Sequence, residues 1–199
     1  MKLTRESVKI AAYMAHMFPD KFNMREVDLS GLDLSELDLS GLDLSGANME
    51  KTIFSGSNLM GANMSDSYLD SAKLNGANMD NVNLSGAQAP WAYMAGAFLA
   101  SANLSRINLA GANLSWACLD NANMRLANMG KAIARSASMR YADMAGAILS
   151  GATLEDANLI GADLTNAELH GVTLRGAKLE KAKTTDAVAL VLALGMLVE

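Results

Sequence analysis

The 199-residue chain has few of the residues that cross-link a polypeptide or hold it in a membrane. Its one cysteine, Cys118, allows neither an intramolecular disulfide nor a cysteine-based zinc cluster. No apolar run approaches the ~20 residues of a membrane-spanning helix, and the start lacks the apolar region of a signal peptide. The net charge of −5 gives no general argument for direct nucleic-acid binding. We therefore expect a cytoplasmic protein outside the membrane.

Proline and aromatic residues are also scarce. The only prolines are Pro19 and Pro90, and aromatics make up 5% of the chain although apolar residues make up 51%. The interior must therefore be filled by Leu, by the 14 Met and by small Ala side chains.

Leu or Met recurs at every fifth residue, without an insertion, from Met24 to Leu179. Of these 32 central residues, 20 are Leu, 9 are Met and one is Phe54, whereas Ala89 and Ala134 are smaller. The position two residues before each centre is Ala in 21 of 32 cases. Asn or Asp commonly lies between the two, and Ser and Gly often follow. A period held this long predicts a repeat architecture.

A period of five matches neither an α-helix nor a simple strand. It fits a β-solenoid in which each pentapeptide forms one side of a square and every fifth residue points inward. Four pentapeptides then close a 20-residue coil, and adjacent coils hydrogen-bond at ~4.8 Å spacing. The 32 centres predict eight coils and a rod roughly 38 Å long. Gly and Ser suit the corners, where the chain turns.

The order Ala, Asn or Asp, Leu or Met, Ser, Gly resembles the pentapeptide-repeat proteins over roughly residues 22–183. The resemblance implies an all-β solenoid, a right-handed quadrilateral β-helix of about eight coils. It says little about function, because this scaffold carries several roles. Some members resemble a DNA duplex and protect type II topoisomerases from quinolones, so gyrase is one implied partner.

Capping helices are expected at both ends, because a solenoid otherwise exposes unpaired backbone. Residues 1–21 are predicted to contain an N-terminal capping helix that starts at Thr4 and ends before Pro19. The β-helix is predicted over 22–183, and 184–199 form a C-terminal apolar helix. The inner stripe of the first helix is expected to comprise Val8, Ala11, Ala12, Ala15 and Phe18.

The stretch from Ala187 to Val198 contains no polar residue, whereas a cap needs only one apolar face. The surplus apolar surface favours a homodimer through this helix. The alternatives are a monomeric cap and the loss of a segment that follows. The expected dimer contacts are Leu190, Leu192, Leu194 and Leu197.

The rare aromatic residues gather in two successive predicted coils, where Trp91, Tyr93, Phe98 and Trp116 form a candidate partner patch. Exposed aromatic side chains are enriched at binding hot spots. The alternative is local packing, because Ala89 removes interior volume nearby. We number the faces of the coil in chain order from Met24. The third face is the least regular, with outward residues Asp33, Ile53, Lys73, Tyr93, Asn113, Ile133, Thr153 and Thr173.

The first face instead carries an unbroken series of Asn and Asp, which we expect to hydrogen-bond to one another and to nearby backbone. Charge is banded along the rod. Residues 26–100 hold ten acids and two bases, 101–140 hold one acid and five bases, and 141–199 hold eight acids and four bases. Within the basic band, four residues follow one another around a single coil and are interpreted as solubilising charge. They are Arg125, Lys131, Arg135 and Arg140.

The sequence lacks the constellations of an enzyme, a metal site or a cofactor site. Asp28, Asp33, Asp38 and Asp43 lie on different sides of the coil and cannot converge on one ion. Cys118 has no nearby histidine to activate it. A rod with a filled interior is also expected to lack a concave pocket.

We therefore predict a non-enzymatic scaffold that presents one face of a rigid rod to an unidentified protein partner. The alternative is a DNA-mimicking protein that binds gyrase.

Overall fold

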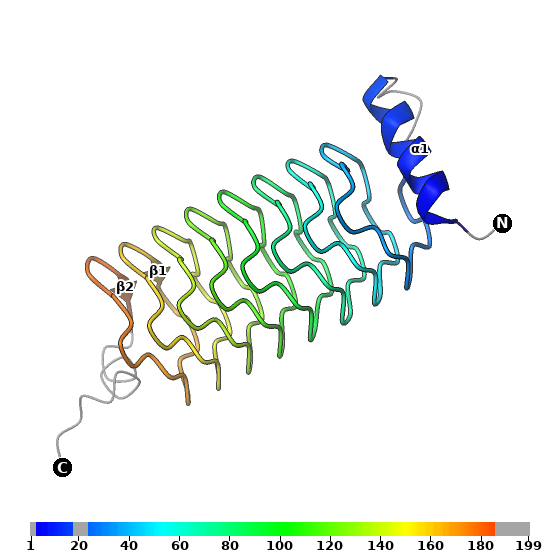
Figure 1. The fold of residues 1–199 in the computed structure, drawn as a ribbon. Helices are drawn as coiled ribbons and strands as arrows, with labels where there is room; N and C mark the ends of the chain where they lie inside the picture. Colours follow the sequence, from blue (N-terminus) through cyan, green and yellow to red (C-terminus); the bar gives the residue numbers. More distant parts are fainter. Residues whose placement is uncertain (1–2, 18–23, 186–199) are drawn as a thin grey trace, which may run out of the picture.

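The computed structural model describes residues 3–17 and 24–185, which form a rod of stacked coils with one helix at the N-terminal end (Figure 1). Helix α1 spans Arg5–Met17. Strands β1 (Asp163–Leu164) and β2 (Lys183–Thr184) pair in parallel, with Asp163 beside Lys183. The expected C-terminal helix, with Leu190, Leu192, Leu194 and Leu197, lies outside the described residues.

Parallel bridges join residues that are 20 apart throughout the rod. The first four are Asp28 to Asn48, Asp33 to Ile53, Asp38 to Asn58 and Asp43 to Asn63, one on each face. Residues 24–183 thus form eight coils of 20 residues, and the predicted β-helix is confirmed. Within the described residues only β1 and β2 are continuous strands, because each side is too short for more than a single bridge before the chain turns. The right-handed sense stays a prediction.

Each corner is a tight turn that requires a left-handed residue. The N–H of Ala112, for example, donates to the carbonyl of Leu109 at 3.0 Å, and Gly111 between them has a φ of +68°. All 32 positions two residues after a centre have a positive φ, and 14 of them are glycine. A positive φ at this position is typical of a type II turn, which favours glycine there. We name each corner after the face that precedes it.

The interior is apolar throughout the middle of the rod. Leu104, Leu109, Leu114 and Leu119 occupy four successive sides of one coil and are all fully buried, as predicted. The residues two positions before them are buried as well, so both inward registers are filled; they are Ala102, Ile107, Ala112 and Ala117. Ala89 and Ala134 are also fully buried.

Amide side chains form the expected ladder on the first face. Asn63 Nδ2 donates to Asp43 Oδ1 at 3.1 Å, and Asn83 Nδ2 donates to Asn63 Oδ1 at 3.0 Å. The same contact continues through Asn103 to Asn123. Each acceptor oxygen also receives the N–H two residues further along, as Asn103 does from Ser105 at 3.2 Å. The structural interpretation of this series is confirmed.

Helix α1 covers the N-terminal end of the rod (Figure 1). Thr4 caps it as predicted: its Oγ1 accepts the Ser7 N–H at 3.2 Å, while the Ser7 hydroxyl accepts the Thr4 N–H at 2.8 Å. Val8, Ala12 and Ala15 are buried, as expected for the inner stripe, and Ala11 is half-buried. Phe18 and Pro19 lie outside the described residues.

The same helix satisfies carbonyls of the open backbone edge. Arg5 donates from Nη1 to the Asp33 carbonyl at 2.8 Å and from Nη2 to the Ser35 carbonyl at 2.6 Å. The Nε2 of His16 lies 2.8 Å from the Ser40 carbonyl, so this nitrogen must carry the proton. The helix therefore seals both the apolar core and part of the edge that would otherwise invite strand addition.

Candidate protein-binding surface

The four aromatic residues singled out in the sequence all lie on the outside of two adjacent coils. The exposed fractions are 64% for Trp91, 48% for Tyr93, 52% for Phe98 and 70% for Trp116. Tyr93 projects from the third face and Phe98 from the fourth, while Trp91 and Trp116 occupy the second and third corners. We call these four residues the aromatic patch.

The two tryptophans stand where the backbone favours glycine. Trp91 has a φ of +54° and Trp116 a φ of +59°. A left-handed backbone costs a residue with a Cβ roughly 1–2 kcal/mol, and a bulky residue there is unusual. These side chains contribute nothing to the fully buried inner registers. Sixteen other corners also hold a residue with a Cβ in this conformation, so the left-handed backbone is a property of the repeat and does not by itself mark these two corners.

Trp91 is accommodated by a glycine in the next coil. A Cβ added at Gly111 would lie 2.7 Å from Cδ1 of the Trp91 ring, so any larger residue there would displace the indole. Tyr141 lies against Gly161 in the same manner. The corner glycines thus serve the tight turn and also the close approach of a ring from the preceding coil.

The aromatic patch lies in an almost uncharged part of the rod. Between residues 81 and 119 the only charged residue is Arg106, which occupies the first corner. The aromatic residues of the patch were predicted from the sequence, but the band with almost no charge was not. It is visible in the sequence as the stretch between Asp80 and Asp120, in which only Arg106 is charged.

The next coil carries the basic residues at its four corners. Arg125 pairs with Asp143 at 3.3 Å, and Arg135 pairs with Glu155 at 3.2 Å. Glu155 also accepts from Arg175 at 3.2 Å, so a column of alternating charge runs along the third corner. Arg140 stacks on Tyr141, with its guanidinium carbon 5.7 Å from the ring centroid. These bases are therefore partly neutralised within the rod.

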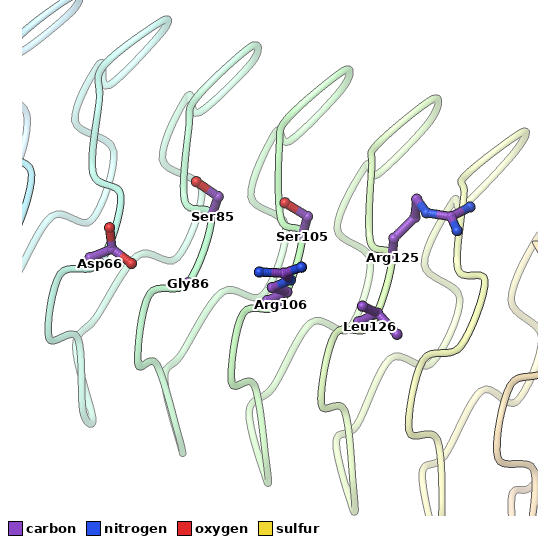
Figure 2. A pocket seen from close by; sticks show the side chains of 7 residues that line it. All are labelled: Asp66, Ser85, Gly86, Ser105, Arg106, Arg125 and Leu126. Carbon is purple, nitrogen blue, oxygen red and sulfur yellow. The ribbon is translucent and has the colours of Figure 1, made fainter.

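A groove of about 370 Å³ opens on the first corner, away from the aromatic patch (Figure 2). It exists because Gly86, Ser85 and Ser105 leave a gap between the side chains of Asp66 and Arg106. The expectation that the rod would offer no concave surface was therefore wrong. A filled interior does not prevent small corner residues from leaving a surface notch. Its other lining residues are Arg125 and Leu126.

The aspartates of the first coil accept hydrogen bonds from the turns that follow them. Ser35 donates its hydroxyl to Asp33 at 2.6 Å and Ser40 donates to Asp38 at 2.7 Å. These hydrogen bonds stabilise the carboxylates and lower the pKa of both groups below the ordinary value. The Thr165 hydroxyl lowers the pKa of Asp163 in the same way.

Within residues 3–17 and 24–185, no cluster of three or more histidine, cysteine or acidic side chains is arranged to hold a metal ion. No helix in that part of the chain is long and apolar enough to cross a membrane.

This chain belongs to the pentapeptide-repeat family. The family described as pentapeptide repeats matches it with eight copies, in overlapping stretches between residues 23 and 183. A comparison with curated proteins finds no match.

The chain is similar to two solved structures at low identity. HetL, a pentapeptide repeat protein involved in heterocyst differentiation regulation in the cyanobacterium Nostoc sp. strain PCC 7120, is 26% identical. That match covers 94% of this chain and 98% of HetL, with a TM-score of 0.33. QnrB1, a plasmid-mediated fluoroquinolone resistance protein, is 20% identical over 87% of this chain and 96% of its own, with a TM-score of 0.42. These values assign no function to the present chain.

Proposed function

We propose that this protein is a non-enzymatic scaffold that binds a protein partner through the aromatic patch. The observation that carries the proposal is the coincidence of four exposed aromatic side chains with two coils in which Arg106 and Asp120 are the only charged residues. The core of a protein interface is typically rich in aromatic residues and depleted of charge, and its rim is polar. Here Asp70 and Asp80 border the band on one side, and Lys131, Arg135 and Arg140 border it on the other.

One feature supports a binding role over local packing. The exposed fractions of the aromatic side chains run from 48% for Tyr93 to 70% for Trp116, so much of their area is available to a partner. Pentapeptide-repeat proteins are generally structural and non-catalytic, which agrees with a scaffold. The cytoplasmic location expected from the sequence stays a prediction.

The test compares a patch variant with a matched control in affinity capture from cell extract. The patch variant is Trp91→Ala, Tyr93→Ala, Trp116→Ala, and the control is Tyr68→Ala, Tyr141→Ala, which removes exposed aromatics outside the patch. We expect a captured protein that is lost with the patch variant, is retained with the control and binds directly when purified. Equal capture by both variants would contradict the proposal.

Tryptophan fluorescence gives a second readout, because the only two tryptophans of the chain both belong to the patch. Addition of the purified partner is expected to shift their emission to shorter wavelength as the rings leave water. An unchanged emission spectrum at saturating partner would place the contact elsewhere.

The alternative is a DNA mimic that binds gyrase. A duplex about 38 Å long carries roughly 22 negative charges, because DNA has one charge per ~1.7 Å. Residues 22–181 hold 17 acids and 11 bases, and a basic coil interrupts the acidic surface. The rod therefore carries far less net negative charge than a duplex of the same length, which favours the scaffold over the DNA mimic. A supercoiling assay separates the two, since a mimic inhibits or protects gyrase at micromolar concentration with strong salt dependence.

A further inference from the structure

We propose that the third face is self-complementary and that a second copy of this chain packs on it in antiparallel orientation. The inference rests on the proposed function, because it names the partner of the same aromatic patch. It concerns the side of the rod and is independent of the C-terminal residues 184–199.

The placement of the residues follows from a two-fold axis that lies between the rods, perpendicular to both. The overlap of the two rods is largest when this axis lies at the middle of the eight coils, between the fourth coil (84–103) and the fifth (104–123), and this is the register we propose. The fourth coil of one copy then faces the fifth of the other, and the third faces the sixth. We call each pair of opposed coils a layer. On the third face and its flanking corners, opposed positions are 20 residues apart where the fourth coil meets the fifth and 60 residues apart where the third meets the sixth.

At the centre, large side chains oppose small ones. The corner of Trp116 meets the corner of Gly96, and Tyr93 meets Asn113. The corner of Trp91 meets that of Gly111, where each copy's own indole already lies. The two Trp91 rings are thus brought side by side around the axis. An isologous interface requires this kind of self-complementary shape.

Charges are complementary in the next layer. The corner that carries Asp70 in the third coil faces the corner that carries Lys131 in the sixth. Because of the two-fold axis, this opposition occurs twice in the dimer. In the outermost layer the corner of Glu36 faces that of Arg175. No two like charges stand at opposed positions on the third face or on the two corners that flank it.

Two other arrangements are less favourable. A parallel pair on the same face would bring the corner of Lys131 against the corner of Arg135, which places like charges together. An antiparallel pair on the second face would oppose Asp28 to Glu168, two acids. The antiparallel pair on the third face avoids both repulsions and also covers most of the aromatic patch.

The available area suits a dimer of modest affinity. Eight coils at ~4.8 Å spacing make a face roughly 38 Å long, and the five residues of one side span at most about 16 Å. The flat footprint is therefore at most roughly 600 Å², below the ~800 Å² per partner of a standard interface, and the projecting aromatic rings add to the buried area. The third face also lacks the ladder of side-chain hydrogen bonds that connects the coils on the first face, since no hydrogen bond joins the side-chain amides of its described residues.

The experiment measures sedimentation of the full chain at tens of micromolar, together with tryptophan emission on dilution. We expect a dimer whose emission shifts to longer wavelength as it dissociates. Asp70→Lys or Lys131→Glu alone is expected to weaken the dimer at least about tenfold, because each change creates two like-charge contacts. The double variant Asp70→Lys, Lys131→Glu restores opposite charges and is expected to dimerise like the wild type. Leu192→Asp, Leu194→Asp serves as the control and is expected to leave this dimer unchanged.

A monomeric wild type would overturn the inference, as would a double variant no stronger than the single ones. A dimer lost only in the Leu192→Asp, Leu194→Asp control would also overturn it and would place the contact in the C-terminal residues. These outcomes concern the dimer alone. The proposed function stands if the wild type binds another purified protein that the patch variant fails to bind. If the patch variant alters neither self-association nor the capture of a partner, both proposals are overturned.

Discussion

The first coil and the middle coils follow the same repeat but differ in the size of the side chains two residues before each centre. In the first coil the position two residues before each centre holds a large side chain, namely Val27, Leu32, Leu37 and Leu42. In the fifth coil the same four positions hold Ile107, Ala112, Ala117 and Ala122. The first coil adjoins helix α1, whereas a middle coil is covered by another coil on each side.

The outer surfaces differ in the same sense. The outward residues of the first coil are Asp28, Asp33, Asp38 and Asp43, and all four side chains accept a backbone N–H from the turn that follows them. The middle coils replace them with amides and, on two faces, with Tyr93 and Phe98. One end of the rod is thus specialised for closing the stack, while the middle coils carry exposed aromatic side chains for which we propose a binding role.

The largest expected effect comes from detaching the cap. Val8→Asp places a charge at a position that is 1% exposed, which costs about 3–5 kcal/mol if the helix stays docked. We expect the helix to detach, so that amides of coil 24–43 exchange faster while those of 84–123 keep their protection. Hydrogen exchange measures this, with the exposed Lys9→Asp as control. Equal loss of protection in both regions would show that the coils are not stabilised mainly by their nearest neighbours.

The next effect tests the width of the coil. Ala112→Leu introduces a larger side chain at a fully buried position and is expected to destabilise the protein by about 1–3 kcal/mol. The residue in the same column of the first coil is Leu32, which is only partly buried. Urea unfolding of Ala112→Leu and of Leu32→Ala compares the two. A neutral Ala112→Leu would mean that the middle coils are as wide as the first.

A smaller effect is expected at the alanine centres. Ala134 stands in a column where Leu114 and Leu154 are native neighbours, so Ala134→Leu should be neutral or stabilise by up to about 1 kcal/mol. Thermal unfolding measures the change. A clear fall in melting temperature would show that the coil is already narrowed at this point.

The smallest effect concerns pH. The pKa of Asp38 is lowered, so its contribution to stability is present above the ordinary value of 3.8 and is lost as the pH falls through the lowered value. Asp38→Asn keeps an acceptor oxygen for the Ser40 N–H, as Asn58 does for Met60. We expect a slightly lower melting temperature for the variant at pH 7, because it lacks the stabilised charge, and a smaller further loss below pH 4. If the melting temperatures of the variant and the wild type fall equally below pH 4, groups other than Asp38 cause the loss of stability in acid.

The fold was predictable because every centre obeys one geometric constraint. A single insertion would move all later leucines off the inward register, so the unbroken period from Met24 to Leu179 defines the coil. The positive φ at all 32 corner positions was less visible, because 18 of them are not glycine. Tertiary stacking imposes the turn even where the local residue, such as Trp116, disfavours it.

The surface was predictable only in part. The aromatic patch could be found because residues 20 apart are neighbours on one face, a relation that the period supplies. The groove beside Gly86 could not, because it depends on how Asp66 and Arg106 lean across a gap between corners. The contacts of Arg5 and His16 with edge carbonyls also escaped prediction, since the repeat does not determine where helix α1 lies.

The central claim is that the aromatic patch serves binding and not the fold. The most direct measurement is the melting temperature of the double variant Trp91→Gly, Trp116→Gly, with Trp91→Gly alone as a check on additivity. We expect a melting temperature equal to or above that of the wild type, because two exposed side chains are removed and two left-handed corners gain glycine. A fall of several degrees would contradict it and would show that the tryptophans pack to stabilise the narrow middle coils.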